Sequence, residues 1–157
     1  MLTFIYLYQI VPSAAFHLFR AIKTWTNLQH LHLTNIAFPP NAHETCFANL
    51  TTPSLRTIYI GQSTFLSPQC IAALCIAKHE ALEFIHLVDA YQESIWGPRL
   101  RRSDVESHIL ESSGLGDPIE AVELVSVVRK WVLCEARTER TMGGDRADGE
   151  VIPAVVN

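Results

Sequence analysis

Four short hydrophobic patterns of the same form recur along residues 1–87 of the chain. In each one, apolar side chains occupy the first, fourth and sixth positions, as Leu28, Leu31 and Leu33 do. The patterns are Leu2–Leu7, Leu28–Leu33, Leu55–Ile60 and Leu82–Leu87. Their period of about 27 residues is typical of leucine-rich repeats, in which each unit supplies one short strand and one return segment.

A unit of this length cannot bury its own apolar face, so consecutive units have to stack against one another. The sequence therefore predicts an α/β fold, a short leucine-rich-repeat solenoid over residues 1–90 with parallel strands on its concave side and helices on its convex side. Helix-start signals fall between the patterns, at Ser13, at Asn41 with Glu44, and at Ser67 followed by Pro68.

The period fails after Leu87, where the sequence changes character. Residues 91–102 read as a loop, Ser103 with Glu106 as a capping box, and Asp117 as the start of a further helical segment. Residues 126–137 are rich in β-branched side chains, so the sequence does not decide whether this stretch is a helix or a strand. We expect residues 91–141 to form a loop and a non-repeat capping segment over the end of the array, and 142–157 to form a flexible tail.

The composition narrows the class of protein. A chain of 157 residues that is 48% hydrophobic and 18% charged is long enough for one globular domain. A net charge of −4 argues against a nucleic-acid partner, which requires a concentrated basic face. The cluster of Arg99, Arg101 and Arg102 is expected to be a solvated loop. Outside the N-terminus no apolar run reaches the length of about 18 residues that a membrane helix needs.

The four cysteines are Cys46, Cys70, Cys75 and Cys134, and none forms a C-x-x-C pair. The first three fall in return segments, where a small apolar side chain packs well. We expect buried, reduced thiols in a cytoplasmic or nuclear protein, although an even number of cysteines leaves disulfides formally open.

The N-terminal segment Met1–Ile10 can be interpreted in two ways. It is apolar and precedes small residues, as in a secretory signal, but it lacks a positively charged start. It also carries the Leu2–Leu7 pattern in near register with the repeats, which favours a strand.

The candidate functional residues follow from the alternation of side chains along a strand. If the pattern residues point into the core, the intervening residues point outward: Phe4, Tyr6, Tyr8, His30, His32, Thr34, Thr57, Tyr59, Gly61, Phe84, His86 and Val88. Their central row is Tyr6, His32, Tyr59 and His86. Rings with polar tips are enriched at protein interfaces because they bury a large area and still form a hydrogen bond. We predict a partner-binding concave face of Tyr6, His30, His32, Tyr59, Phe84 and His86.

These rings allow other interpretations. The rings could simply stack on one another and stiffen the sheet. His32 and His86 lie two strands apart, about 10 Å at the usual strand spacing, so they cannot share one metal ion. Phosphate-binding loops and nucleophile or metalloprotease motifs do not occur in the sequence. We therefore expect no metal, no cofactor and no enzymatic activity.

Six segments carry a family likeness. Residues 25–33, 53–58 and 81–83 read WTNLQHLHL, PSLRTI and ALE, and residues 95–101, 134–140 and 142–145 read IWGPRLR, CEARTER and MGGD. Together they resemble the leucine-rich region of fungal F-box-like proteins, over roughly residues 15–150. In that family an N-terminal F-box binds the adaptor of a Skp–cullin–F-box ubiquitin ligase, and the repeats select the substrate.

The resemblance implies that the repeats bind a substrate protein. The segment before Ser13 is too short to hold an F-box, so a ligase-adaptor function is expected only if an F-box lies upstream. Two alternatives stay open: a secreted small protein whose N-terminal segment acts as a signal, and a truncated, non-functional paralogue.

Overall fold

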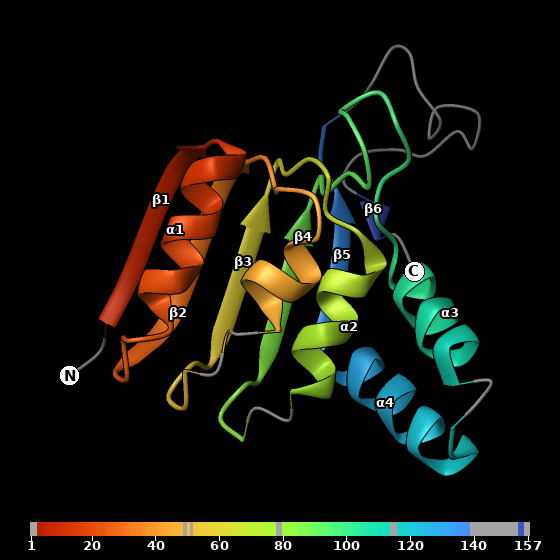
Figure 1. Ribbon diagram of the computed structural model, residues 1–157. Coiled ribbons are helices and arrows are strands. Elements are labelled where there is room, and N and C mark those ends of the chain that lie inside the picture. Colours follow the sequence, from red (N-terminus) through yellow and green to blue (C-terminus); the bar gives the residue numbers. More distant parts are fainter. Residues whose placement is uncertain are drawn as a thin grey trace.

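The computed structural model describes residues 3–48, 50, 52–77, 80–113, 116–138 and 154–155, with the backbone alone for 3, 4, 6, 154 and 155. Its strands are β1 (Thr3–Ile10), β2 (Leu28–Ile36), β3 (Thr57–Gly61), β4 (Phe84–Val88), β5 (Val132–Ala136) and β6 (Ala154–Val155). β1 to β5 are parallel and lie side by side in chain order, and β6 adds antiparallel to β5 (Figure 1). The sheet is open, because β1 does not pair with the other end.

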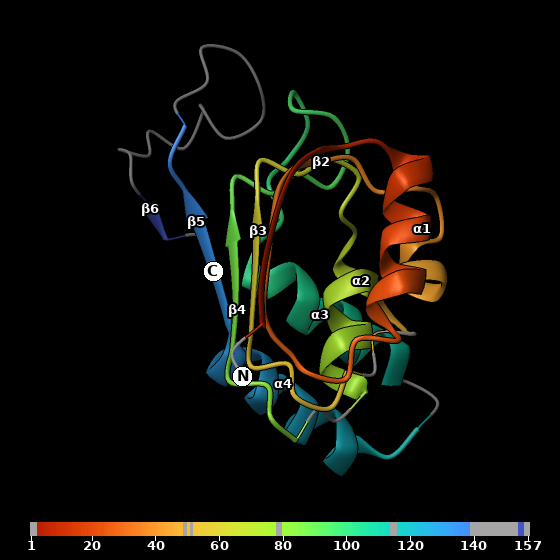
Figure 2. The same ribbon diagram turned by 90° about the vertical axis from the view of Figure 1, so that its left-hand side faces the viewer.

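The helical segments cover one face of this sheet. They are α1 (Pro12–Ile22), the single π-type turn η1 (His43–Phe47), α2 (Pro68–Ile76), α3 (Arg102–Ser112) and α4 (Pro118–Trp131). Figure 2 shows the sheet nearly edge-on, with α1 and α2 on the same side of it. We call the opposite side, which none of the described helices covers, the open face.

The core lies between the sheet and the helices. Leu31, Ile58 and Ile85 stand opposite one another on β2, β3 and β4, and each is at most 1% exposed. Apolar side chains therefore alternate with the open-face residues along each strand, as expected for a sheet covered on one side. Between α1 and η1, the rings of Phe19 and Phe47 lie 5.1 Å apart between centroids, and both are buried.

The same backbone conformation recurs where the strands end. A residue with positive φ lies near the end of each of the first four strands: Gln9 and Asn35 are second-last in β1 and β2, and Gln62 and Asp89 directly follow β3 and β4. These positions recur with the same period as the hydrophobic patterns. Asn and Asp adopt this conformation more readily than most residues. Just after these residues, backbone hydrogen bonds join positions that are equivalent in successive hydrophobic patterns. They run from Ala37 N to Ile10 O, from Thr64 N to Ile36 O and from Tyr91 N to Ser63 O, at 2.9, 3.0 and 2.9 Å.

Several sequence predictions are confirmed. A strand forms at each of the four hydrophobic patterns, including β1 at residues 3–10. α2 begins at Pro68 after Ser67, and α4 begins at Pro118, where the Asp117 side chain accepts a hydrogen bond from Ile119 N at 2.9 Å.

Other predictions are wrong in detail. The segment after Asn41 forms only one π-type turn, without a side-chain cap. α3 begins at Arg102, and the side chain that caps it is Asp104, which accepts from Arg101 N at 2.8 Å, rather than Ser103 with Glu106. Arg99 is not solvated, since it is 5% exposed.

The ambiguous stretch of residues 126–137 contains both kinds of element. α4 continues through Trp131, and β5 begins at Val132. The predicted flexible tail, residues 142–157, lies outside the described residues except for β6.

Candidate functional site on the open face

The residues of the predicted central row stand opposite one another in the strand register. The strand register places Tyr6 opposite His32, His32 opposite Tyr59, and Tyr59 opposite His86. The side chain of Tyr6 lies outside the described part of the chain. His30, Thr57 and Phe84 form a second row beside it on β2, β3 and β4.

The rings of the central row contact one another across the strands. His32 and Tyr59 stack, with centroids 4.0 Å apart and planes 25° apart. Tyr59 meets His86 edge-on, at 5.3 Å and 87°. Phe84 packs against His86 at 5.5 Å. The three rings of the central row are half-buried and Phe84 is 37% exposed, so they form one continuous surface with part of each ring open to solvent.

Gly61 makes room for this arrangement. A Cβ atom at Gly61 would lie 2.8 Å from Cε1 of Tyr59 and 2.9 Å from its hydroxyl oxygen. Such distances are shorter than van der Waals contact, so the phenol of Tyr59 lies directly over the glycine. The absence of a side chain at position 61 therefore allows this orientation of Tyr59.

Hydroxyl groups hold the two histidines of β2. His30 Nδ1 lies 2.7 Å from Thr57 Oγ1 on the neighbouring strand, and His32 Nε2 lies 3.1 Å from Thr34 Oγ1 on its own strand. Which atom donates depends on the tautomer of each imidazole. Burial lowers the pKa of His32 from its ordinary value of 6.5, because the charged form loses hydration. His32 therefore favours the neutral form at pH 7.

Two charged residues that the sequence analysis missed complete the surface. His86 Nε2 lies 3.2 Å from Glu135 Oε1, and the two side chains are 17% and 18% exposed. Arg137 binds the other carboxylate oxygen of Glu135, with Nε and Nη2 both 2.8 Å from Oε2. The contact between His86 and Glu135 is an ion pair when the imidazole is protonated.

Glu135 and Arg137 were missed because they belong to β5 and the segment just after it. β5 pairs with β4 so that His86 stands opposite Leu133 and Val88 opposite Glu135. Had residues 132–136 been assigned as a strand, the alternation of side chains would have placed Leu133 and Glu135 on the open face.

Some of the residues predicted to face outward do not form an exposed surface. Val88 is 4% exposed and Gly61 is also buried, whereas Tyr8 is 56% exposed. Val88 stands between Gly61 on β3 and Glu135 on β5 in the strand register. The phenol of Tyr59 lies over Gly61 on one side of Val88, and the side chain of Glu135 belongs to the neighbouring residue on the other side.

The four thiols are separate from this surface. Cys46 lies in η1, Cys70 and Cys75 in α2, and Cys134 in β5, and all four are free and buried. Burial raises the pKa of Cys70 to about 11 and the pKa values of Cys75 and Cys134 to about 12. These groups are therefore protonated at neutral pH and are poor nucleophiles.

The described residues contain no group of three or more His, Cys, Asp or Glu side chains arranged to hold a metal ion. None of the described helices combines the length and apolar character required to span a bilayer. Comparisons of the chain with protein-family models, with curated proteins and with solved structures give no match.

Proposed function

We propose that this chain is a leucine-rich-repeat module that binds another protein through its open face. The ring surface of His32, Tyr59 and His86, extended by Phe84 and by the Glu135 carboxylate, is the observation that carries this proposal.

The repeat assignment is supported by features that recur with one period. The hydrophobic patterns, the residues with positive φ and the hydrogen bonds beyond the strands all share the same spacing along the chain. A backbone hydrogen bond also recurs with this spacing near the start of the strands. Arg56 N donates to Gln29 O, and Glu83 N donates to Arg56 O, both at 2.8 Å. Parallel strands in chain order, with helical segments on one face, are the arrangement that stacked repeats of this kind produce.

The chemistry of the open face supports a protein partner. Aromatic and imidazole rings provide apolar area with few rotatable bonds, so ordering them on binding costs little entropy. Their mutual packing fixes the rings before a partner arrives. The carboxylate of Glu135, whose negative charge is balanced by Arg137, provides polar oxygen atoms at the edge of this surface.

The finer proposal is that the partner is a substrate of a ubiquitin ligase. It rests on the resemblance of six segments to the repeat region of fungal F-box-like proteins. Mapping the 5′ end of the native transcript tests it. An in-frame upstream F-box would make the repeats the substrate-selecting part of a ligase receptor, whereas a transcript that begins at Met1 would remove the link to the ligase.

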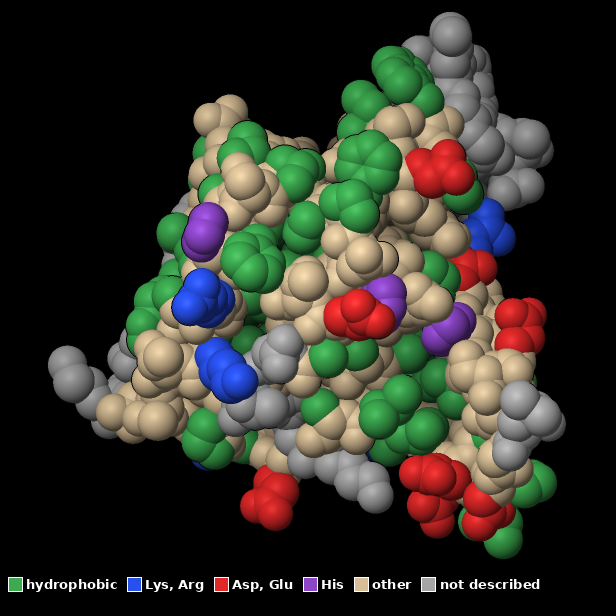
Figure 3. All heavy atoms as spheres, viewed as in Figure 1, with side chains coloured by type: hydrophobic (Ala, Val, Ile, Leu, Met, Phe, Trp, Pro, Cys, Tyr) green, Lys and Arg blue, Asp and Glu red, His purple; other side chains and the backbone are tan. Residues whose placement is uncertain are grey.

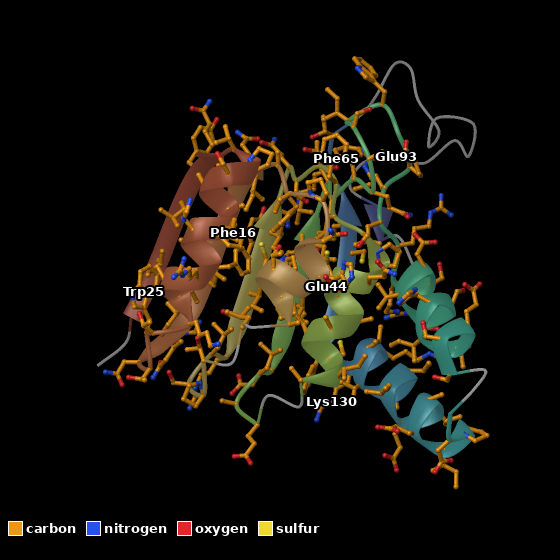
Figure 4. The ribbon with its side chains drawn as sticks, in the orientation of Figure 1. Phe16, Trp25, Glu44, Phe65, Glu93 and Lys130 are labelled. Atoms are coloured by element: carbon orange, nitrogen blue, oxygen red, sulfur yellow. The ribbon has the colours of Figure 1, made fainter. Side chains whose placement is uncertain are left out.

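Partner binding is tested by affinity purification with paired variants. Tyr59→Ala combined with His86→Ala removes two rings of the central row, and Phe16→Ala on α1 removes an exposed ring from the helix side (Figure 4). We expect specific partners to be lost with the open-face variant and retained with the Phe16 variant. Identical partner sets for the wild type and the open-face variant would refute the proposal, provided that circular dichroism shows all three proteins folded.

A further inference from the structure

A second surface lies on the helix side, between α2 and α4. Two hollows of about 290 and 380 Å³ lie along α4 and share Glu120 and Leu124 in their walls. The first reaches to the C-terminal end of α3, and the second continues to Trp131 at the end of α4. We call these two adjoining hollows together the α2–α4 groove.

The floor of the α2–α4 groove is apolar. Ala72, Cys75 and Ile76 contribute from α2, and Leu124, Val127 and Trp131 contribute from α4. Ile76 is 54% exposed, and Trp131 and Leu124 are only partly buried against the core. A set of large apolar groups is thus left open to solvent.

The rim of the groove is acidic. Glu80, Asp117, Glu120 and Glu123 line the two hollows, and no described lysine or arginine does. None of these four carboxylates forms an ion pair with a described lysine or arginine, whereas Glu83, Glu106 and Glu135 each have one. Figure 3 shows acidic side chains gathered beside hydrophobic ones at the lower right, over α4.

Stabilisation of α4 accounts for only some of the four acidic residues on the rim. Asp117 caps α4 and Glu120 lies in its first turn, where negative charge interacts favourably with the helix dipole. Glu123 lies beyond the first turn, and Glu80 lies between α2 and β4, outside any helix. Their positions along the same apolar floor need another explanation.

We propose that the α2–α4 groove binds a basic amphipathic helix of a partner protein. Such a helix places apolar side chains on one face, to cover Leu124, Val127 and Trp131, and lysine or arginine side chains on its flanks, to pair with the carboxylates of the rim. Charge complementarity selects this occupant, because an acidic or neutral segment would leave the rim charges unpaired.

The length of the groove suits a helix of this kind. Its lining positions run from Asp117, the N-cap of α4, to Trp131 at the end of α4, which corresponds to about 21 Å at the rise of an α-helix. A partner helix of about four turns covers this distance. Lys130, on the last turn of α4, is outside the described lining (Figure 4).

The probe for this site is a synthetic amphipathic peptide of about four helical turns, with leucine on one face and lysine on the other. We expect saturable one-to-one binding to the full chain by calorimetry, weakening as salt is raised. Glu120→Lys with Glu123→Lys should weaken binding by about tenfold or more, and Ile76→Ser should also weaken it.

A matched double reversal serves as the control. Glu44→Lys with Glu93→Lys changes the net charge by the same amount, at two exposed positions away from α4 (Figure 4). This variant should bind the peptide as the wild type does, and so should Tyr59→Ala on the open face. An equal loss in the Glu44 and Glu93 variant, an unchanged affinity in Ile76→Ser, or no saturable binding to the wild type would overturn the proposal.

Discussion

The guanidinium of Arg99 lies 3.2 Å from the carboxylate of Asp89, and the two side chains are only 5% and 3% exposed. Asp89 also accepts hydrogen bonds from Arg137 N at 2.9 Å and from the hydroxyl of Thr138 at 2.8 Å. Arg99 donates to the carbonyl oxygen of Thr138 and lies over the ring of Tyr91. One buried ion pair therefore joins the end of β4, the loop after it and the segment that follows β5.

Replacing Asp89 by alanine should destabilise the fold by about 3–5 kcal/mol, because it leaves the buried guanidinium of Arg99 without its counter-charge. It also leaves the donors of residues 137 and 138 unpaired. Asp89→Asn keeps an acceptor and tolerates the positive φ of this position, so its cost should be smaller. Urea denaturation measures both costs, and equal costs would show that the acceptor retained by asparagine contributes nothing and that loss of the negative charge accounts for the whole effect.

Neighbouring residues on β3 should respond differently to truncation. Ile58 is 1% exposed in the core, so Ile58→Ala should cost about 2–5 kcal/mol through lost burial and the cavity left behind. Tyr59→Ala removes ring contacts on the half-buried open face and should cost only about 1 kcal/mol. Chemical denaturation of the two variants provides the comparison. Equal losses would mean that the ring surface acts mainly as core.

Stability should depend on pH through His32. Its pKa in the folded chain is lowered from 6.5 by burial, so the unfolded chain binds a proton at a higher pH than the folded chain does. Stability from this group is then fully present above about pH 6.5 and falls as the pH drops toward the lowered pKa. His32→Gln cannot titrate, so its melting temperature should fall less steeply over that window. If the melting temperatures of the wild type and of His32→Gln fall equally with pH, His32 is not the source of the pH dependence.

The buried cysteines should resist alkylation in the folded protein. The raised pKa values of Cys70, Cys75 and Cys134 keep these thiols protonated at about pH 8, and burial blocks the reagent. We expect slow reaction with iodoacetamide under native conditions and rapid modification of all four cysteines in denaturant, measured by mass spectrometry. Fast native labelling of any one of them would show that its surroundings open readily.

The strands β1 to β4 could be predicted because their hydrophobic pattern is local and recurs along the sequence. Leu31, Ile58 and Ile85 occupy the same place in successive patterns, and a parallel register then follows from the spacing alone. The same spacing predicted that His32, Tyr59 and His86 align across the strands, and the strand register has them opposite one another.

The structure of residues 91–113 and 116–138 and the placement of Glu135 and Arg99 depend on contacts between segments that are distant in the sequence. Val127 and Val128 favour strands by propensity, yet they lie in α4, which is capped by Asp117 and packed against the core. Glu135 could not be placed until that boundary was known. Arg99 reads as part of a solvated basic cluster because its counter-charge, Asp89, lies outside that cluster, at the end of the preceding strand.

Gly61→Ala should disturb the candidate site without unfolding the chain. The three atoms nearest to the added Cβ all belong to the far end of the Tyr59 side chain, which can rotate away, so the cost in stability should be small. The displaced phenol would then no longer stack on His32, and the upfield ring-current shift of the His32 protons should diminish in the NMR spectrum. In a Tyr59→Ala background the same substitution should leave the His32 resonances unchanged. An unaltered His32 spectrum in Gly61→Ala itself would mean that Gly61 does not set the position of the Tyr59 ring.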